Sequence, residues 1–168
     1  IYGSFYFFVN PRMFIWSLYH DLSPDNVEID MFGFRGPAFC YLGNRLMSLQ
    51  LVKNGMTDAV IFNPQGNNML PADILYKKNI FAVRGSFRPV TLVNIDMFEK
   101  GLQMFMEDCA CNIDDKEVLF EITISNLRAA GDIDERDFLD RVDVIAKLGY
   151  TVIISNFSEY FRLIDYFA

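Results

Sequence analysis

The sequence has little of the residue types that build many catalytic and metal sites. It holds one histidine, His20, and three cysteines, two of which stand in the triplet "CAC" at 109 to 111. It contains neither a serine, histidine and aspartate set nor a phosphate-binding motif of the GKS or GKT type. An odd number of cysteines excludes a complete disulfide framework, and the triplet lacks the spacing of a metal-binding pair. We therefore expect reduced thiols, a cytoplasmic protein and no bound metal.

Long apolar runs and an excess of positive charge are also missing. No apolar run reaches the roughly 20 residues that span a bilayer, because the best candidate, residues 5 to 16, is interrupted by Asn10, Pro11 and Arg12. The net charge is −7, from 15 basic and 22 acidic residues. Nucleic acids and membranes are therefore poor candidates as partners, and an anionic ligand would have to be held by local groups.

The residues that are present are sufficient for one domain. The chain has 168 residues, of which 52% are apolar and 15% aromatic. Aromatic residues are dense at 2–19, which predicts either core packing or contact with a partner or a second copy. We expect an N-terminal portion (1–78) and a C-terminal portion (79–168) to share one core. We also expect the sequence to be part of a longer chain, since it begins without methionine.

Apolar runs alternate with helical periodicity along the chain. Strands are predicted at 27–32, 58–63, 79–84, 117–124 and 151–155. Helices are predicted at 38–54, 93–107 and 134–149, and from 158 to the end. Residues 64–68, "PQGNN", are predicted to form a turn, and 126–134 a loop. This pattern predicts an α/β fold with a largely parallel, Rossmann-like sheet and helices on both faces.

Polar and cationic residues follow four of the predicted strands. In a parallel sheet, ligands bind beyond the carboxyl ends of the strands, where these side chains would converge. Small hydrogen-bonding groups with arginines suit an anionic ligand. The alternative is that the serines and asparagines cap the helices that follow. The candidates are Arg35, Gly85, Ser86, Phe87, Arg88, Thr91, Asn94, Ser125, Asn126, Arg128, Ser155 and Asn156.

The stretch "VRGSFRPVTLVNIDMFEKGLQMF", which begins at Val83, resembles a known phosphate-binding segment. It is similar to the first strand, loop and helix of the nucleotidylyltransferases that adenylate phosphopantetheine or nicotinate mononucleotide. Gly85, Ser86, Phe87, Pro89 and Thr91 match the loop of that family. The phrase "RGSFRPVT" also resembles a poorly characterised bacterial family that is labelled, by analogy, nicotinate-nucleotide adenylyltransferase. The resemblance implies a nucleotidylyltransferase-like fold for 79–168, with ATP and Mg²⁺ as cofactors.

The chain departs from that family at functional positions. Arg88 stands where the family has an acidic or amide residue, Val93 replaces a glycine, and Asn94 replaces the catalytic histidine. If adenylyl transfer survives, Arg88, Arg128 or Arg35 would have to supply the missing positive charge. Two functions stay open: binding of a nucleotide or another phosphorylated small molecule, with adenylyl transfer to a mononucleotide, or a catalytically silent interaction domain. Arg88 would contact phosphate in the first case, or pair with a carboxylate such as Glu121.

Overall fold

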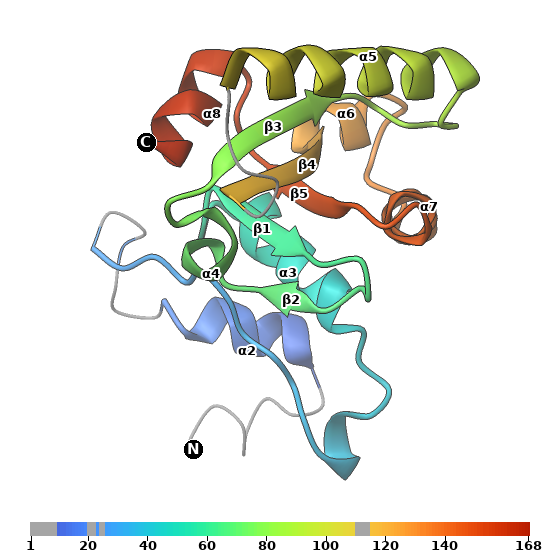
Figure 1. Ribbon diagram of the computed structural model, residues 1–168. Coiled ribbons are helices and arrows are strands. Elements are labelled where there is room, and N and C mark those ends of the chain that lie inside the picture. The colour runs from blue at the N-terminus through green and yellow to red at the C-terminus, as the bar shows by residue number, and fades with distance from the viewer. Residues whose placement is uncertain (1–9, 20–22, 24–25, 110–114) are drawn as a thin grey trace.

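The computed structural model describes residues 10–19, 23, 26–109 and 115–168. In this part of the chain it shows an α/β protein with one five-stranded mixed sheet (Figure 1). The strands are β1 (Ala59–Phe62), β2 (Asn68–Met69), β3 (Asn79–Arg84), β4 (Lys116–Thr123) and β5 (Thr151–Ser155). The helices are α2 (Pro11–Ser17), α3 (Asn44–Lys53), α4 (Pro71–Leu75), α5 (Leu92–Cys109), α6 (Ile124–Arg128), α7 (Glu135–Lys147) and α8 (Tyr160–Phe167), with a short 3₁₀ helix at Pro37–Phe39.

The sheet has the strand order β2-β1-β5-β4-β3. β3, β4 and β5 are parallel, which confirms the prediction for these three strands and puts Gly85 just beyond the carboxyl end of β3. β1 runs antiparallel to both β2 and β5, so the prediction of a largely parallel sheet was wrong for this half. All four residues of β1 are buried, and a strand buried on both faces has the same apolar pattern in either direction.

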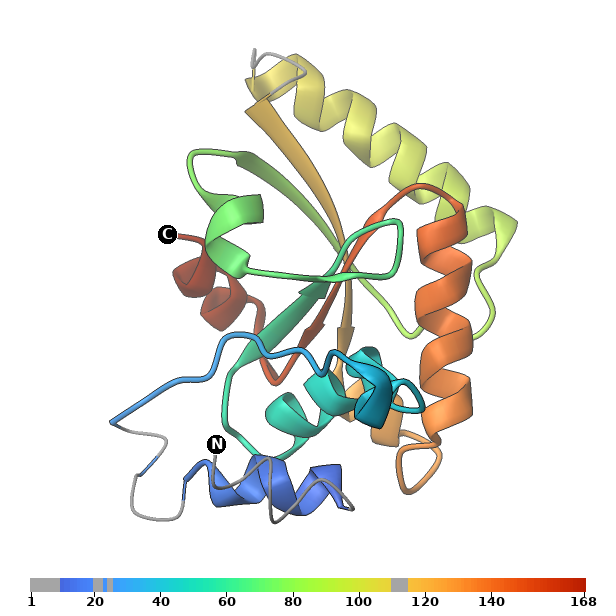
Figure 2. The same ribbon diagram turned by 90° about the horizontal axis from the view of Figure 1, so that it is seen from below.

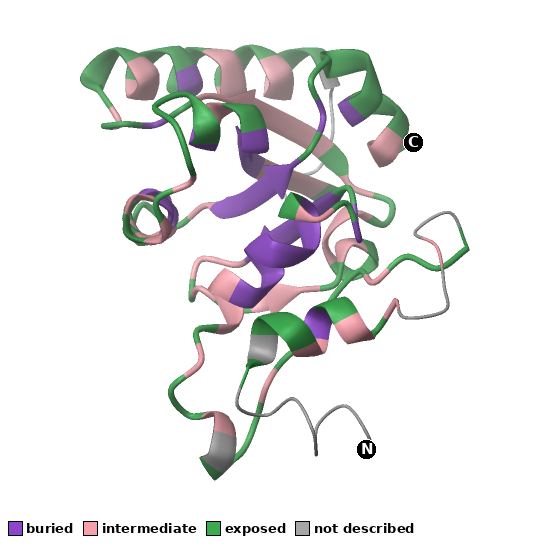
Figure 3. Cartoon of the chain, turned by 180° about the vertical axis from the view of Figure 1, so that it is seen from behind, coloured by how far each residue is buried: buried purple, intermediate pink, exposed green. Residues whose placement is uncertain are grey.

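Helices cover both faces of the sheet, as expected (Figure 2). One face carries Val60, Phe62, Phe120, Val152 and Ile154, which pack with buried residues of α3, α5 and α7. The other face is smaller and packs against α4 and α8. Figure 3 shows that the buried residues concentrate in the central strands and in α3. No helix in the described ranges is long and apolar enough to cross a bilayer.

Three predicted segments differ from the structure by more than a shift of their ends. Residues 27–32 form neither helix nor strand, although their apolar residues Ile29 and Phe32 do pack against the core. The predicted helix at 38–54 is divided, because Gly43 is the N-cap from which α3 begins. Part of the predicted loop at 126–134 belongs to α6. The turn at 64–68 is confirmed as the tip of the hairpin that joins β1 to β2.

The N-terminal aromatic segment is described only from residue 10 onward, so the prediction for residues 2–9 lies outside the described residues. Within α2, Ile15 is fully buried in the core and Trp16 is largely exposed. The N-terminal portion shares the sheet of the C-terminal portion, because β1 pairs with β5.

Candidate functional site

The glycine loop after β3 is filled by its own side chain. Phe87 has a φ of 47°, which turns its ring into the core, where the ring lies 5.3 Å from that of Phe120. A Cβ atom on Gly85 would lie only 2.9 Å from Cζ of Phe87. The backbone N–H of Gly85 donates to the carbonyl of Glu121 at 3.1 Å. Gly85 therefore makes room for Phe87 and extends the β-ladder.

The two Thr-x-x-Asn sequences of the chain form matching helix caps. The hydroxyl of Thr91 accepts from the N–H of Asn94, and the amide oxygen of Asn94 accepts from the N–H of Thr91 at 2.9 Å. At α6, the Thr123 hydroxyl accepts from the N–H of Asn126 at 3.0 Å and donates to its amide oxygen. The arrangement at α5 is a reciprocal capping box, whereas at α6 the hydroxyl of Thr123, and not its backbone N–H, donates to Asn126. These hydrogen bonds therefore support the interpretation that the asparagines cap helices.

The polar groups beside the loop also contact protein. Arg88 is half exposed, and its Nε lies 2.9 Å from a carboxylate oxygen of Asp137 on α7. Arg141, which is almost fully buried, donates to the carbonyl of Ser86 at 3.1 Å and pairs with Asp137. Arg88, Asp137 and Arg141 therefore fasten the loop to α7.

A buried ion pair connects the carboxyl ends of the three parallel strands. Arg84 on β3 donates from Nε and Nη2 to the two carboxylate oxygens of Glu121 on β4, at 2.6 and 2.9 Å. The hydroxyl of Ser155 on β5 donates to the same carboxylate at 2.5 Å. The hydrogen bonding of Arg84 to Glu121 raises the pKa of the Arg84 guanidinium. The aromatic ring of Tyr160 on α8 covers Arg84, with its centroid 4.3 Å from Cζ.

The structure thus divides the predicted site residues between several places. Gly85, Ser86, Phe87 and Arg88 lie against α7, whereas Ser155 belongs to the buried ion pair. Ser125 and Arg128 are exposed on α6, and Asn156 is exposed after β5. Arg35 lies elsewhere, in the segment that precedes α3.

We expect the substitution Gly85→Ala to lower the free energy of unfolding by about 1–3 kcal/mol, because the new methyl group would overlap the buried Phe87 ring. Urea denaturation followed by circular dichroism measures this change. The control is Gly33→Ala, since a Cβ atom there meets nothing within 4 Å. A Gly85→Ala protein as stable as the wild type would contradict the packing role.

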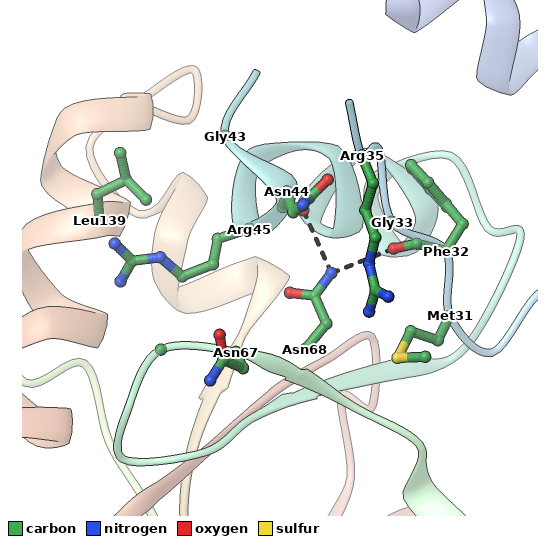
Figure 4. Close-up of a pocket in the computed structure, with 11 residues that line it drawn as sticks. Met31, Phe32, Gly33, Arg35, Gly43, Asn44, Arg45, Asn67, Asn68 and Leu139 are labelled. Atoms are coloured by element: carbon green, nitrogen blue, oxygen red, sulfur yellow. Dashed lines mark hydrogen bonds between the residues drawn. The ribbon is translucent and has the colours of Figure 1, made fainter. Parts of the chain in front are cut away.

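A cavity with a volume of about 690 Å³ lies beside the N-terminus of α3 (Figure 4). We call it the arginine pocket. Its walls come from the segment before α3, the first turn of α3, the β1–β2 turn and one residue of α7. The lining residues are Met31, Phe32, Gly33, Arg35, Gly43, Asn44, Arg45, Gly66, Asn67, Asn68 and Leu139.

Two asparagines shape the wall of the arginine pocket. The side chain of Asn44 accepts from the N–H of Phe34 at 2.8 Å and donates to its carbonyl at 3.2 Å. The amide nitrogen of Asn68 donates to the carbonyl of Phe32 and to the hydroxyl of Ser48, at 3.3 and 2.7 Å. These bonds hold the segment 32–34 against α3 and β2.

Positive charge and unused donors meet in the arginine pocket. Arg35 is exposed, and within the described ranges no carboxylate forms an ion pair with it. Arg45 pairs with Asp143, and its guanidinium lies beside Gly66. Gly66 has a φ of +76°, so a side chain there would be strained as well as close to Arg45. The N-cap of α3, Gly43, offers no side-chain acceptor to the first backbone N–H groups of the helix.

One buried acceptor in the same wall has no hydrogen-bond partner among the residues that the structure describes. The amide oxygen of Asn68 is buried and unpaired, and in Figure 4 it points toward the side of the pocket occupied by Arg45 and Asn67. Sequence reasoning found Arg35 but missed Arg45, Asn67 and Asn68. The only signal for the two asparagines was the turn "PQGNN", which also marks an ordinary hairpin.

Comparisons with models of known protein families, with curated proteins and with solved structures gave no match to this chain.

Proposed function

We propose that this chain binds a small phosphorylated molecule in the arginine pocket. The observation that carries the proposal is that Arg35, which forms no ion pair with any described carboxylate, lines a cavity beside the N-terminus of α3, where Gly43 makes no side-chain cap hydrogen bond. Helix N-termini favour anions through their free N–H groups and their dipole, and arginine binds phosphate oxygens in a bidentate manner. The volume of about 690 Å³ falls within the range of small-molecule sites.

The lining indicates what the rest of the ligand should be. Met31, Phe32 and Leu139 offer apolar surface, and Asn67 is an exposed amide. The unpaired oxygen of Asn68 favours a ligand with a hydroxyl or amino donor. A nucleotide or sugar phosphate has all of these features. No lining residue is a carboxylate, so Mg²⁺ bound with ATP would be held by the phosphates of the ligand.

The proposal concerns binding and not adenylyl transfer. The parallel units from β3 through α5 to β4 and on to β5 are compatible with a Rossmann-like nucleotide fold, as the loop resemblance implies. However, Asn94 is used as a helix cap and Arg88 pairs with Asp137. These contacts favour the alternative of a catalytically silent interaction domain over catalysis at the loop.

We expect Arg35→Ala to weaken phosphate binding by about 10- to 100-fold, the loss typical of a charge-assisted hydrogen bond. Isothermal titration of the whole chain with inorganic phosphate, ribose 5-phosphate, AMP and ATP, with and without Mg²⁺, measures the affinities. Circular dichroism should show an unchanged fold, because Arg35 is exposed.

Arg88→Ala and Arg128→Ala are the matched controls, since both remove an exposed arginine that the sequence places in a phosphate site. We expect both to bind as the wild type does. If Arg88→Ala abolished binding while Arg35→Ala retained it, the ligand would belong to the glycine loop. If the wild type bound none of the four ligands, the silent-domain alternative would be favoured.

A further inference from the structure

β3 is the outermost strand of the sheet on the side away from β2. It pairs with β4 on one side, and no other described strand pairs with it. It contains no proline, and its one charged side chain, Arg84, is held by Glu121. Open edge strands of this kind pair readily with another chain unless proline, bulges or free charges prevent it.

The hydrogen-bonding groups on the open side of β3 can be assigned. The N–H of Gly85 points at β4, because it donates to the carbonyl of Glu121. Since the N–H and C=O groups of successive residues alternate in direction, those of Ile80, Ala82 and Arg84 point away from β4. Ala82 is the midpoint of this set.

An apolar stripe on α5 lies on the same side as this edge. Val93, Met97 and Met104 are 66%, 67% and 64% exposed, and at 3.6 residues per turn their directions agree within about 40°. On the surface of α5, Gly101 lies between this stripe and the buried Phe98. A Cβ atom on Gly101 would be 3.0 Å from the Phe81 ring of β3. Connections between parallel strands through a helix are right-handed. In such a crossover from β3 to β4, the flank of α5 that carries the apolar stripe faces the free edge of β3. Figure 1 shows α5 lying over β3.

The strand edge and the stripe share one centre. Ala82 is the midpoint of the residues of β3 whose backbone groups point outward, and the midpoint between Met97 and Met104 falls beside Gly101, which lies over Phe81. A single two-fold axis perpendicular to the sheet can therefore pass through both. An antiparallel strand partner related by such an axis must be identical in sequence.

We propose that the side wall formed by β3 and α5 is an isologous interface between two copies of this chain. Ala82 lies opposite its own counterpart, Ile80 lies opposite Arg84 of the partner subunit, and the two sheets join into one. The two α5 helices run antiparallel, so that Met97 packs near Met104 of the partner subunit.

The size of this wall is sufficient for a specific dimer. α5 has 18 residues and is about 27 Å long. A helix packed on a strand at the usual spacing makes a wall about 20 Å high. Its height and length together give an area of about 500 Å² on each copy, or about 1,000 Å² in total for the dimer. Specific interfaces begin near this total. The arginine pocket lies by β2, at the opposite edge, so this interface and the proposed ligand site are tested separately.

Light scattering during size-exclusion chromatography tests the interface on the whole chain. We expect the wild type to approach twice the 19.4 kDa of one chain as its concentration rises. Met97→Glu with Met104→Glu should restore the mass of one chain with an unchanged circular dichroism spectrum, because both residues are exposed and would place like charges together. The control, Leu92→Glu with Gln103→Glu, adds the same charges to the other flank of α5 and should remain dimeric.

A cysteine pair tests the register of the strands. In a background with Cys40, Cys109 and Cys111 changed to serine, Ala82→Cys should form a disulfide-linked dimer, because opposed Cα atoms lie about 5.5 Å apart. Ile80→Cys should not, since its two copies would be separated by four residues, or about 13 Å. A wild type that stays monomeric at every concentration, or a Met97 and Met104 variant that stays dimeric, would overturn the proposal.

Discussion

The substitution Arg84→Met is expected to lower the free energy of unfolding by about 3–5 kcal/mol, which is the usual cost of leaving a buried charge without its partner. Glu121 is fully buried, and Arg84 supplies two of the three hydrogen bonds that the described side chains give to its carboxylate. Without Arg84, the hydroxyl of Ser155 alone would remain. Urea denaturation monitored by circular dichroism measures the loss.

Two further variants define the origin of this loss. Arg84→Met combined with Glu121→Leu should recover much of the stability, because the isolated charge is gone. Arg162→Met should change the stability by less than about 1 kcal/mol, since its ion pair with Glu159 is exposed. If Arg84→Met were no more harmful than Arg162→Met, the buried pair would not stabilise the fold.

The second large effect is expected for Phe138→Ala, with a loss of about 3–5 kcal/mol in the free energy of unfolding. Phe138 is fully buried on α7, and its ring lies 6.2 Å from that of Phe62 on β1. Its removal would leave a cavity between the helix and the sheet. Thermal denaturation should therefore show a markedly lower midpoint.

Leu139→Ala is the matched control, because the neighbouring residue on α7 is partly exposed and lines the arginine pocket. It should cost clearly less stability than Phe138→Ala when both are measured under identical conditions. Equal losses for the two substitutions would contradict the assignment of Phe138 to the core.

The strands that the sequence predicted well share one property. β3, β4 and β5 are apolar runs that end in polar or turn residues, and their parallel arrangement follows from the helices between them. The direction of β1 was not predictable, because a fully buried strand carries no alternation and its partner is far away in the sequence. Residues 27–32 have the alternation of a strand, but they pack beside α3 and outside the sheet.

The candidate site was less predictable than the fold. The sequence identified Arg35 as a cation for an anionic ligand, but it could not show that Arg45 and Asn68 would lie beside it. That proximity depends on the β1–β2 hairpin folding back toward α3. The pairing of Arg84 with Glu121 likewise depends on strand register, which no local pattern specifies.

The central position of β5 has a consequence for how the chain folds during synthesis. Among the five described strands, β1 and β4 are joined through β5, which is the last of the five in the order of synthesis. Until residues 151–155 have emerged, the β1–β2 hairpin and the β3–β4 pair have no strand between them, and the facing edges of β1 and β4 remain unpaired. The late, long-range closure should make folding slow and should make the nascent chain dependent on protection from aggregation.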